Sequence, residues 1–191
     1  MNQAPLGEIL ARFLRVLEEA GVEYMLVGSV ASSVHGEPRS TQDFDIVIEK
    51  SITALEQLLA SLDPEVYYFD PSTARQAYRR SSQFNVLDME QVWKFDIIFQ
   101  RGDAWSRSAF SRRIEGEFSG VKMTVLSPED SILSKLQWAE KMGGSERQLR
   151  DVAGIVQVRS EDLDYDYLDE WLARLGVEDM WAQIGAERES R

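Results

Sequence analysis

Two aspartates stand two positions apart in an otherwise apolar stretch of the chain. Asp43 and Asp45 lie in the run Asp-Phe-Asp-Ile-Val-Ile at positions 43–48. Side chains alternate along a β-strand, so both carboxylates would project from one face and the apolar residues at 44, 46 and 48 from the other. Neighbouring carboxylates repel, and an apolar strand tolerates them poorly unless a cation lies between them. The pair therefore indicates a cation site; the alternative is two acids at an exposed strand edge.

A third acid occurs in a similar setting. Asp96 lies in the run Lys-Phe-Asp-Ile-Ile-Phe at positions 94–99, where it would share a face with Lys94. If this strand lies beside the first, three carboxylates converge. Three oxygen ligands without His or Cys suit Mg²⁺ or Mn²⁺ and not zinc.

A possible phosphate site precedes these acids. Gly28 and Ser29 stand at the end of an apolar strand pattern and at the start of a helical one, where free backbone N–H groups and the helix dipole favour a phosphate. Thirteen residues separate Ser29 from Asp43, and Asp96 follows about fifty residues later. A phosphate cradle next to a carboxylate metal site predicts a nucleoside triphosphate site.

The elements that must position these residues follow from the hydrophobic pattern. Strands and helices alternate over the first seventy residues, which predicts an α/β unit. We expect helices at 6–19, 29–34 and 52–62, strands at 24–27, 43–48 and 65–69, and hairpins that pair 84–89 with 92–99 and 114–117 with 121–126. Ser127 and Pro128 form an N-cap, and the pattern after them is helical. We expect one helix that starts there and ends near residue 143, followed by helices at 148–158, 167–175 and 179–186. The pattern predicts a core domain at 1–126 and a helical subdomain at 127–191.

These motifs together resemble the nucleotidyltransferase superfamily related to DNA polymerase beta. The finer resemblance is to the bacterial AbiEii toxin-like group, and it covers roughly residues 22–156. The matching segments are 27–30, His35–Gly36, 39–45, 93–96, 126–130 with Lys135 in the helix that follows, and Arg150–Asp151.

The resemblance implies an α/β (α+β) fold with a mixed sheet and flanking helices, followed by a C-terminal helical subdomain. It also implies a role for each matching residue. Gly28 and Ser29 would hold the triphosphate. Asp43 and Asp45 would bind two metal ions, and Asp96 would complete that site and help to deprotonate the acceptor hydroxyl. Further along, Lys135 would contact the phosphates and Asp151 would orient the site. From periodicity alone, both of these lie at the edge of an apolar helix stripe and could equally extend to water.

The activity implied is Mg²⁺- or Mn²⁺-dependent transfer of a nucleoside monophosphate from an NTP to an acceptor hydroxyl, with release of pyrophosphate. The toxin-like resemblance favours RNA, particularly a tRNA 3′ end, as the acceptor. A protein hydroxyl or a small molecule such as an aminoglycoside is the alternative. The resemblance also implies an antitoxin partner. A different class of function is a nucleotidyltransferase fold that no longer catalyses and serves as a binding or regulatory protein.

Charge bears on the acceptor. The 191 residues include 21 Lys and Arg against 33 Asp and Glu, a net charge of −12, which argues against strong nonspecific binding to nucleic acid. Residues 161–191 hold ten of these acids and three bases, whereas 72–80 and 101–113 are basic. An RNA acceptor predicts that the cleft mouth is lined by some of six arginines, while 161–191 lies away from it: Arg75, Arg79, Arg80, Arg107, Arg112 and Arg113.

The composition of the chain limits the kinds of bond and metal site that it can form. The chain has no cysteine and one histidine, which removes disulfides, thiolate sites and multi-histidine metal cages. No stretch approaches the ~20 apolar residues of a membrane span. We therefore expect a soluble, cytoplasmic protein with no membrane association.

For several other residues a structural role is at least as well supported by the sequence as a role in binding or catalysis. For His35 we expect a structural hydrogen bond at a helix end. Arg39 and Thr41 would position either a phosphate or the metal-binding strand, and Lys94 would pair with either Asp96 or a phosphate. Core or interface packing is the expectation for the remaining aromatic candidates, which are Tyr24, Trp93, Trp138 and Trp171.

Overall fold

The computed structural model describes residues 5–189 of the chain. Its helices are α1 (Leu6–Glu19), α2 (Gly28–His35), α3 (Ile52–Ser61), α4 (Pro71–Arg80), α5 (Ala104–Ser111), α6 (Pro128–Lys141), α7 (Glu146–Arg159), α8 (Tyr165–Leu175) and α9 (Glu178–Glu189). Its strands are β1 (Tyr24–Leu26), β2 (Asp43–Ile48), β3 (Tyr67–Tyr68), β4 (Gln83–Asp88), β5 (Trp93–Phe99), β6 (Ile114–Phe118) and β7 (Val121–Val125).

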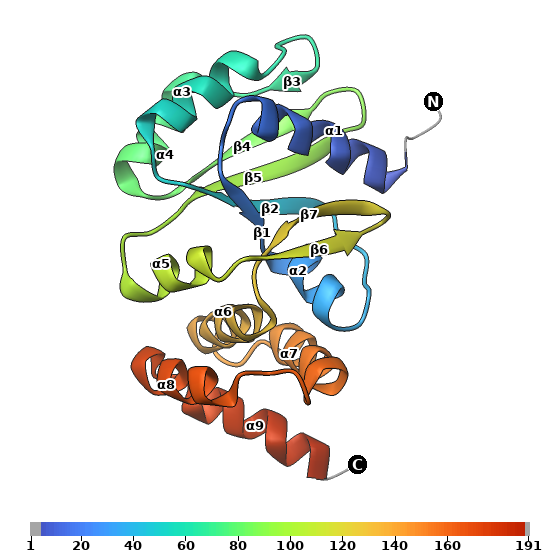
Figure 1. Cartoon of the computed structure of the whole chain (residues 1–191), viewed down its shortest axis with the longest axis vertical. Helices are drawn as coiled ribbons and strands as arrows, with labels where there is room; N and C mark the ends of the chain where they lie inside the picture. The colour runs from blue at the N-terminus through green and yellow to red at the C-terminus, as the bar shows by residue number, and fades with distance from the viewer. Residues whose placement is uncertain (1–4, 190–191) are drawn as a thin grey trace.

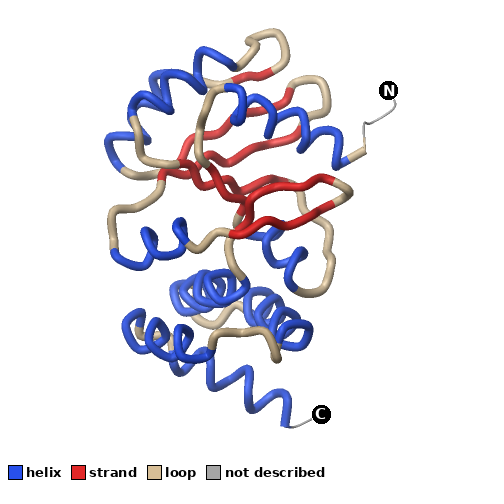
Figure 2. The backbone as a smooth tube through the Cα atoms, in the orientation of Figure 1, coloured by secondary structure: helices blue, strands red, loops and turns tan. Residues whose placement is uncertain are grey.

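Within these residues the strands form one seven-stranded mixed sheet in the order β3-β4-β5-β2-β1-β7-β6. The pairs β2–β5 and β1–β7 are parallel, and the other neighbours are antiparallel. Figure 2 shows the strands as one layer with helices on both sides. The predicted α/β class with a mixed sheet is confirmed, as are both predicted hairpins.

Alternation along the two central strands separates an apolar face from a polar one. The apolar face carries Phe44, Ile46 and Ile48 of β2 and the matching apolar residues of β5, all fully buried. Helices α1, α3 and α4 cover this face and close the main core (Figure 1). The phenyl rings of Phe13 on α1 and Phe95 on β5 stack with their centroids 3.8 Å apart. This packing fixes which face of β2 and β5 points the other way, toward α2, α5 and α6.

Two helices were not expected from the sequence. α4 begins at Pro71 after Asp70, whose side chain accepts a hydrogen bond from the N–H of Ser72, and α5 follows Asp103, which caps it in the same way. Neither helix has a long apolar stripe, since α4 buries only two alanines and α5 only Ala109 and Phe110. Short helices with so little apolar surface leave a weak periodic signal.

One predicted strand is shorter than expected. The pattern at 65–69 forms only the two residues of β3. The backbone N–H groups of Val66 and Tyr67 both donate to the carbonyl oxygen of Asp63, so the chain is still in a turn where the strand was expected to start.

Helices α6 to α9 pack around a second apolar cluster, which includes Leu136, Ile155, Leu168 and Trp171. They lie at the far end of the molecule from α1, α3 and α4 (Figure 1). The side chain of Ser127 accepts from the N–H of Asp130, as the N-cap motif predicts. The division at residue 126 stays a prediction.

Within residues 5–189, no helix combines the length and the apolar character that crossing a lipid bilayer requires.

Candidate active site

The three predicted aspartates lie on one face of the sheet. β2 and β5 are parallel neighbours whose register places Asp45 opposite Asp96 and Asp43 opposite Lys94. Because alternate residues share a face, the three carboxylates and the ammonium group of Lys94 project from the polar face together. Asp96 is only 6% exposed, whereas the side chain of Asp43 is 36% exposed. The site is thus buried at β5 and open at the start of β2.

Lys94 lies between two of these acids. Its Nζ atom is 2.8 Å from Oδ2 of Asp96 and 3.4 Å from Oδ2 of Asp43. The hydrogen bond to Asp96 raises the pKa of Lys94, so the ammonium form persists at neutral pH. Among residues 5–189, no three acidic or histidine side chains surround one common metal position. In this arrangement the lysine supplies positive charge between Asp43 and Asp96.

Asp45 carries an unfavourable negative charge, and Asp96 keeps one carboxylate oxygen without a hydrogen bond. Burial, together with the negative charges of Asp43 and Asp96, raises the pKa of Asp45 to about 6. The Oδ1 atom of Asp96 is buried and has no hydrogen-bond partner among the described residues. A buried acceptor without a donor is costly, and a divalent cation relieves both it and the repulsion. The donor set, three carboxylates with no histidine or cysteine, therefore fits Mg²⁺ or Mn²⁺.

Gly28 brings the start of α2 against this carboxylate site. Its φ angle is +60°, and a Cβ atom at this position would lie 2.1 Å from Oδ2 of Asp45. Only glycine fits both the backbone conformation and the contact. The N-cap residue, Val27, offers no side-chain acceptor to the first turn of α2, so its N–H groups remain available to an anion. The predicted phosphate turn and the metal-binding strand are therefore in direct contact.

A buried ionic network joins α6 and α7 to the phosphate turn. Lys135 of α6 is 6% exposed, and its Nζ donates to Oδ2 of Asp151 on α7 at 2.7 Å. Burial lowers the pKa of Lys135, and the hydrogen bond to Asp151 opposes that shift. The same carboxylate oxygen accepts from Nη2 of Arg39 at 3.1 Å, and that nitrogen also donates to Oγ of Ser29 at 2.7 Å. Lys135 and Asp151 thus face the site and do not extend to water.

Arg39 is the site residue that sequence reasoning left undecided between phosphate and strand. It lies in a loop with no periodic pattern, and its contacts come from Ser29 and from Asp151, ten and 112 residues away. The only signal in the sequence was its place in the segment that leads to Asp43. Thr41 in the same loop does serve the strand, because its hydroxyl donates to the backbone carbonyl of Asp43 at 2.7 Å.

The remaining candidates divide between core and site. His35 is 1% exposed, with its Nε2 2.7 Å from the carbonyl oxygen of Leu126, and burial lowers its pKa, which fits a structural role. Tyr24 and Trp171 are buried in the two cores, and Trp93 packs against Phe44. Trp138 is 55% exposed on α6, so of its two expected roles core packing is wrong and interface packing stays a prediction.

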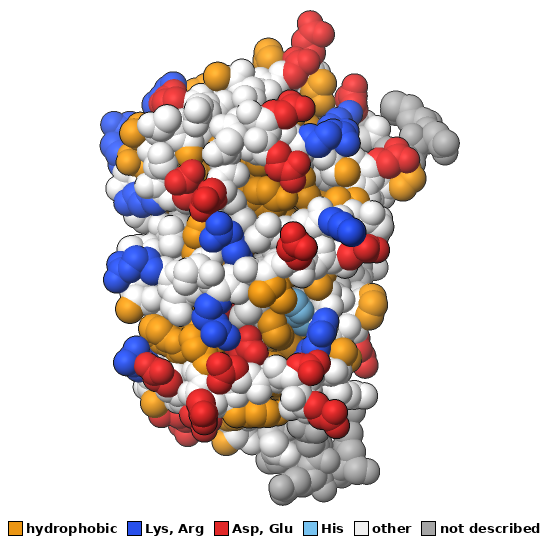
Figure 3. Space-filling model, viewed as in Figure 1, with side chains coloured by type: hydrophobic (Ala, Val, Ile, Leu, Met, Phe, Trp, Pro, Cys, Tyr) orange, Lys and Arg blue, Asp and Glu red, His pale blue; other side chains and the backbone are white. Residues whose placement is uncertain are grey.

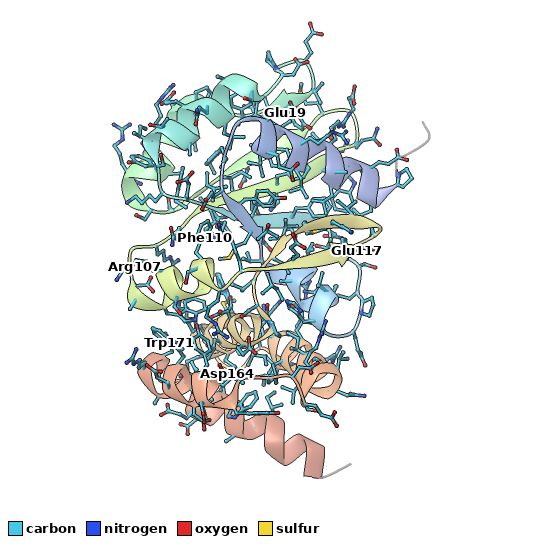
Figure 4. All side chains as sticks on the ribbon, viewed as in Figure 1. Glu19, Arg107, Phe110, Glu117, Asp164 and Trp171 are labelled. Atoms are coloured by element: carbon cyan, nitrogen blue, oxygen red, sulfur yellow. The ribbon has the colours of Figure 1, made fainter. Side chains whose placement is uncertain are left out.

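Three of the six arginines that an RNA acceptor would draw on are paired with acids of this chain. Arg75 pairs with Glu56 of α3, Arg113 pairs with Glu23, and Arg112 lies over the ring of Tyr167 and pairs with Glu129. Arg107 lies on the outer edge of α5, whereas Phe110 of the same helix points toward the sheet (Figure 4). The face in Figure 3 shows cations and acids interspersed without a continuous basic track. Helices α8 and α9, which carry the acidic segment, do lie away from the sheet, as expected (Figure 1).

No protein-family model matches the chain, and no curated protein matches it in sequence. Solved structures match its fold. The lincosamide antibiotic adenylyltransferase LnuA with lincomycin bound has a TM-score of 0.56 at 15% identity, over 82% of this chain and 99% of that one. ANT(2″)-Ia in complex with adenylyl-2″-tobramycin has a TM-score of 0.55 at 11% identity, over 97% and 99%. A nucleotidyltransferase-like antigenic protein from Paracoccidioides brasiliensis has a TM-score of 0.54 at 15% identity, over 95% and 93%. The chain therefore has the nucleotidyltransferase fold.

Proposed function

We propose that this protein is a Mg²⁺-dependent nucleotidyltransferase that moves a nucleoside monophosphate from an NTP to an acceptor hydroxyl. The observation that carries the proposal is the contact between the Gly28 turn and Asp45, which puts the start of α2 against a sheet face that carries three carboxylates. A site that had lost catalysis would have no reason to keep strained acids in this position. The resemblance to the toxin-like group further suggests that this enzyme acts as a toxin in the cytoplasm and has an antitoxin partner.

Each residue has a defined task in this proposal. The first-turn N–H groups at Gly28 and Ser29 bind the β- and γ-phosphates, with the cations of Arg39 and Lys135 beside them. Asp151 holds both cations in place through its shared Oδ2 atom. Asp43, Asp45 and Asp96 would hold the metal ions, which supply charge neutralisation for the phosphates and for the leaving pyrophosphate.

The transfer itself needs one proton acceptor. The acceptor oxygen forms a bond to the α-phosphorus while the bond from that phosphorus to the bridging oxygen breaks, and the electron pair leaves with pyrophosphate. Asp96 takes the hydroxyl proton, which is the role that the resemblance implies for it beside the metal ions. Lys94 must leave the space between Asp43 and Asp96 when cations bind there.

The resemblance favours RNA as the acceptor, but the surface gives that choice little support. Three of the six arginines expected to bind it are paired with acids of this chain, and the net charge is −12. A polyanionic acceptor depends on such cations for most of its affinity.

The activity test uses each α-labelled NTP with Mg²⁺ and the purified protein, plus total tRNA, a protein pool or a small-molecule extract. We expect label in one of these pools together with release of pyrophosphate. Transfer should be lost in the Asp96→Asn variant. Absence of label in every pool, with no pyrophosphate released, would favour the binding or regulatory alternative.

A further inference from the structure

A cavity of about 230 Å³ lies between the polar face of the sheet and the helices α5 and α6. Its lining includes Val47 of β2 and Ile98 of β5, together with Trp105 of α5 and Trp138 of α6. Its rim carries both signs of charge, with Arg101 and Lys141 near Asp103. None of the residues to which the proposed function gives a role lines this cavity.

The cavity continues the candidate active site along the same two strands. Val47 follows Asp45, and Ile98 follows Asp96, each by two positions and on the same face. Two residues of a strand span about 6.6 Å. The cavity therefore begins about 6.6 Å along the strand from Asp96, which is the proposed proton acceptor.

The lining is suited to a flat apolar group with one polar contact. Trp138 exposes 55% of its surface, which is unusual for so large an apolar side chain on a helix. The indole N–H of Trp105 already donates to Asp130 at 3.0 Å, so this residue offers carbon surface to the cavity. The amide nitrogen of Gln137 is buried and has no acceptor within the described part of the chain. These groups would stack on a ring and donate one hydrogen bond to it.

Size restricts the occupant. An apolar cavity of about 150 Å³ takes a benzene molecule, so 230 Å³ admits one substituted or fused ring system. A single ring of a small molecule fits in this space.

We propose that this cavity is the acceptor site and that the acceptor is a small, ring-bearing molecule whose hydroxyl lies beside Asp96. The inference rests on the proposed nucleotidyl transfer and replaces RNA as the acceptor. The ring packs between Trp105 and Trp138, and the amide of Gln137 donates to a ring heteroatom or substituent. In the transfer, the acceptor hydroxyl gives its proton to Asp96 and its oxygen becomes bonded to the α-phosphorus, with pyrophosphate as the leaving group.

The test measures binding of 4-fluorobenzyl alcohol, as a ring probe, by ¹⁹F line broadening. The variants are Trp138→Ala and Gln137→Leu, and the control is Val158→Ala, which truncates an apolar residue of α7 that is equally exposed but lies outside the cavity. Trp138 is half exposed, so its truncation leaves the cores intact. We expect Trp138→Ala to weaken binding about tenfold, Gln137→Leu to weaken it severalfold, and Val158→Ala to leave it unchanged.

Joint stabilisation by Mg²⁺ and ATP is measured on the same variants. We expect it unchanged in all three, because the triphosphate lies at the Gly28 turn. Probe binding that is equal in wild type and in all variants would overturn the acceptor site. Loss of the Mg²⁺–ATP effect in Trp138→Ala would overturn it as well, since the cavity would then hold the nucleobase. Transfer of label to tRNA at equal rates by wild type and Trp138→Ala would also overturn the acceptor site.

The two proposals fail in different ways. If wild type shows no joint effect of Mg²⁺ and ATP, the nucleotidyl transfer itself fails. If the joint effect is present and the probe does not respond to Trp138→Ala, only the acceptor site fails.

Discussion

A Cβ atom at Gly28 would lie 2.1 Å from Oδ2 of Asp45, so the predicted phosphate turn and the predicted metal-binding strand pack too closely for a side chain at residue 28. This contact joins the start of α2 to the polar face of β2. The carboxylate of Asp45 can occupy its position only because residue 28 has no side chain.

Gly28→Ala should therefore impair nucleotide binding far more than it impairs folding. The new methyl group displaces Asp45, and we expect the joint stabilisation by Mg²⁺ and ATP to fall by at least about tenfold in apparent affinity, or about 1.4 kcal/mol. The matched control is Gly21→Ala, because Gly21 has a φ of +66° and no atom within 4 Å of its built Cβ. Both variants should lose about 1 kcal/mol of unfolding free energy from the backbone conformation. Equal nucleotide affinity in the two variants would contradict the role of the contact.

Asp45 should make the metal-free protein less stable as the pH rises. Its pKa is about 6 in the folded protein against 3.8 for an ordinary aspartate, so the folded state holds a proton that the unfolded state has already lost. The unfolding free energy therefore falls between about pH 4 and pH 6, by up to about 3 kcal/mol from this group. Asp45→Asn should lack that fall and be the more stable protein at pH 7.5. Urea unfolding in EDTA at pH 4.5, 6 and 7.5 tests this, and parallel curves for the two proteins would rule it out.

Lys94 should compete with metal ions for Asp43 and Asp96. Removing the ammonium group in Lys94→Met leaves these carboxylates without their cation, so Mg²⁺ should stabilise the variant at a lower concentration than wild type. We expect a shift of about three- to fivefold, since partly exposed pairs contribute about 0.2–1 kcal/mol. Thermal unfolding against Mg²⁺ concentration in the presence of ATP measures it, with Lys122→Met as the control for loss of one exposed charge. A weaker response to Mg²⁺ in Lys94→Met would mean that the lysine helps the metal site instead.

Asp130 should hold α5 and α8 against α6. It is fully buried, and its carboxylate accepts from Trp105, from the hydroxyl of Tyr167 at 2.8 Å and from Ser127 at 2.9 Å. Asp130→Ala leaves these donors unpaired and should lower the unfolding free energy by about 2–4 kcal/mol. Asp162→Ala, at an exposed turn, should change it by less than about 0.5 kcal/mol. Chemical denaturation of both variants decides the point.

The local parts of the site could be predicted from the sequence because they depend on one strand or one turn. Alternation along 43–48 and 94–99 was enough to assign Asp43, Asp45 and Asp96 to a polar face, and the structure adds that the two strands are parallel neighbours. The Gly28 turn was recognised from its place between a strand pattern and a helix pattern. The helix caps at Ser127 and Pro128 were equally local.

The rest depends on contacts between distant segments. Arg39 enters the site through Asp151, and the periodicity of α6 left Lys135 undecided between the site and water. Trp138 was expected to pack in a core or at an interface, and it is 55% exposed at the edge of a cavity between α5 and α6. The helices α4 and α5 were not predicted, because each buries too few apolar residues to produce a helical hydrophobic pattern in the sequence.

The central claim is that the three carboxylates and the phosphate turn form one site for an NTP and its metal ions. The most direct measurement is the unfolding free energy of wild type and of the Asp43→Asn/Asp45→Asn variant with Mg²⁺ alone, ATP alone and both together. We expect the two ligands together to stabilise wild type by about 2.7 kcal/mol at a hundredfold excess over Kd, more than the sum of their separate effects, and to stabilise the folded variant no more than that sum. Equal joint stabilisation of both proteins would place the nucleotide elsewhere and contradict the claim.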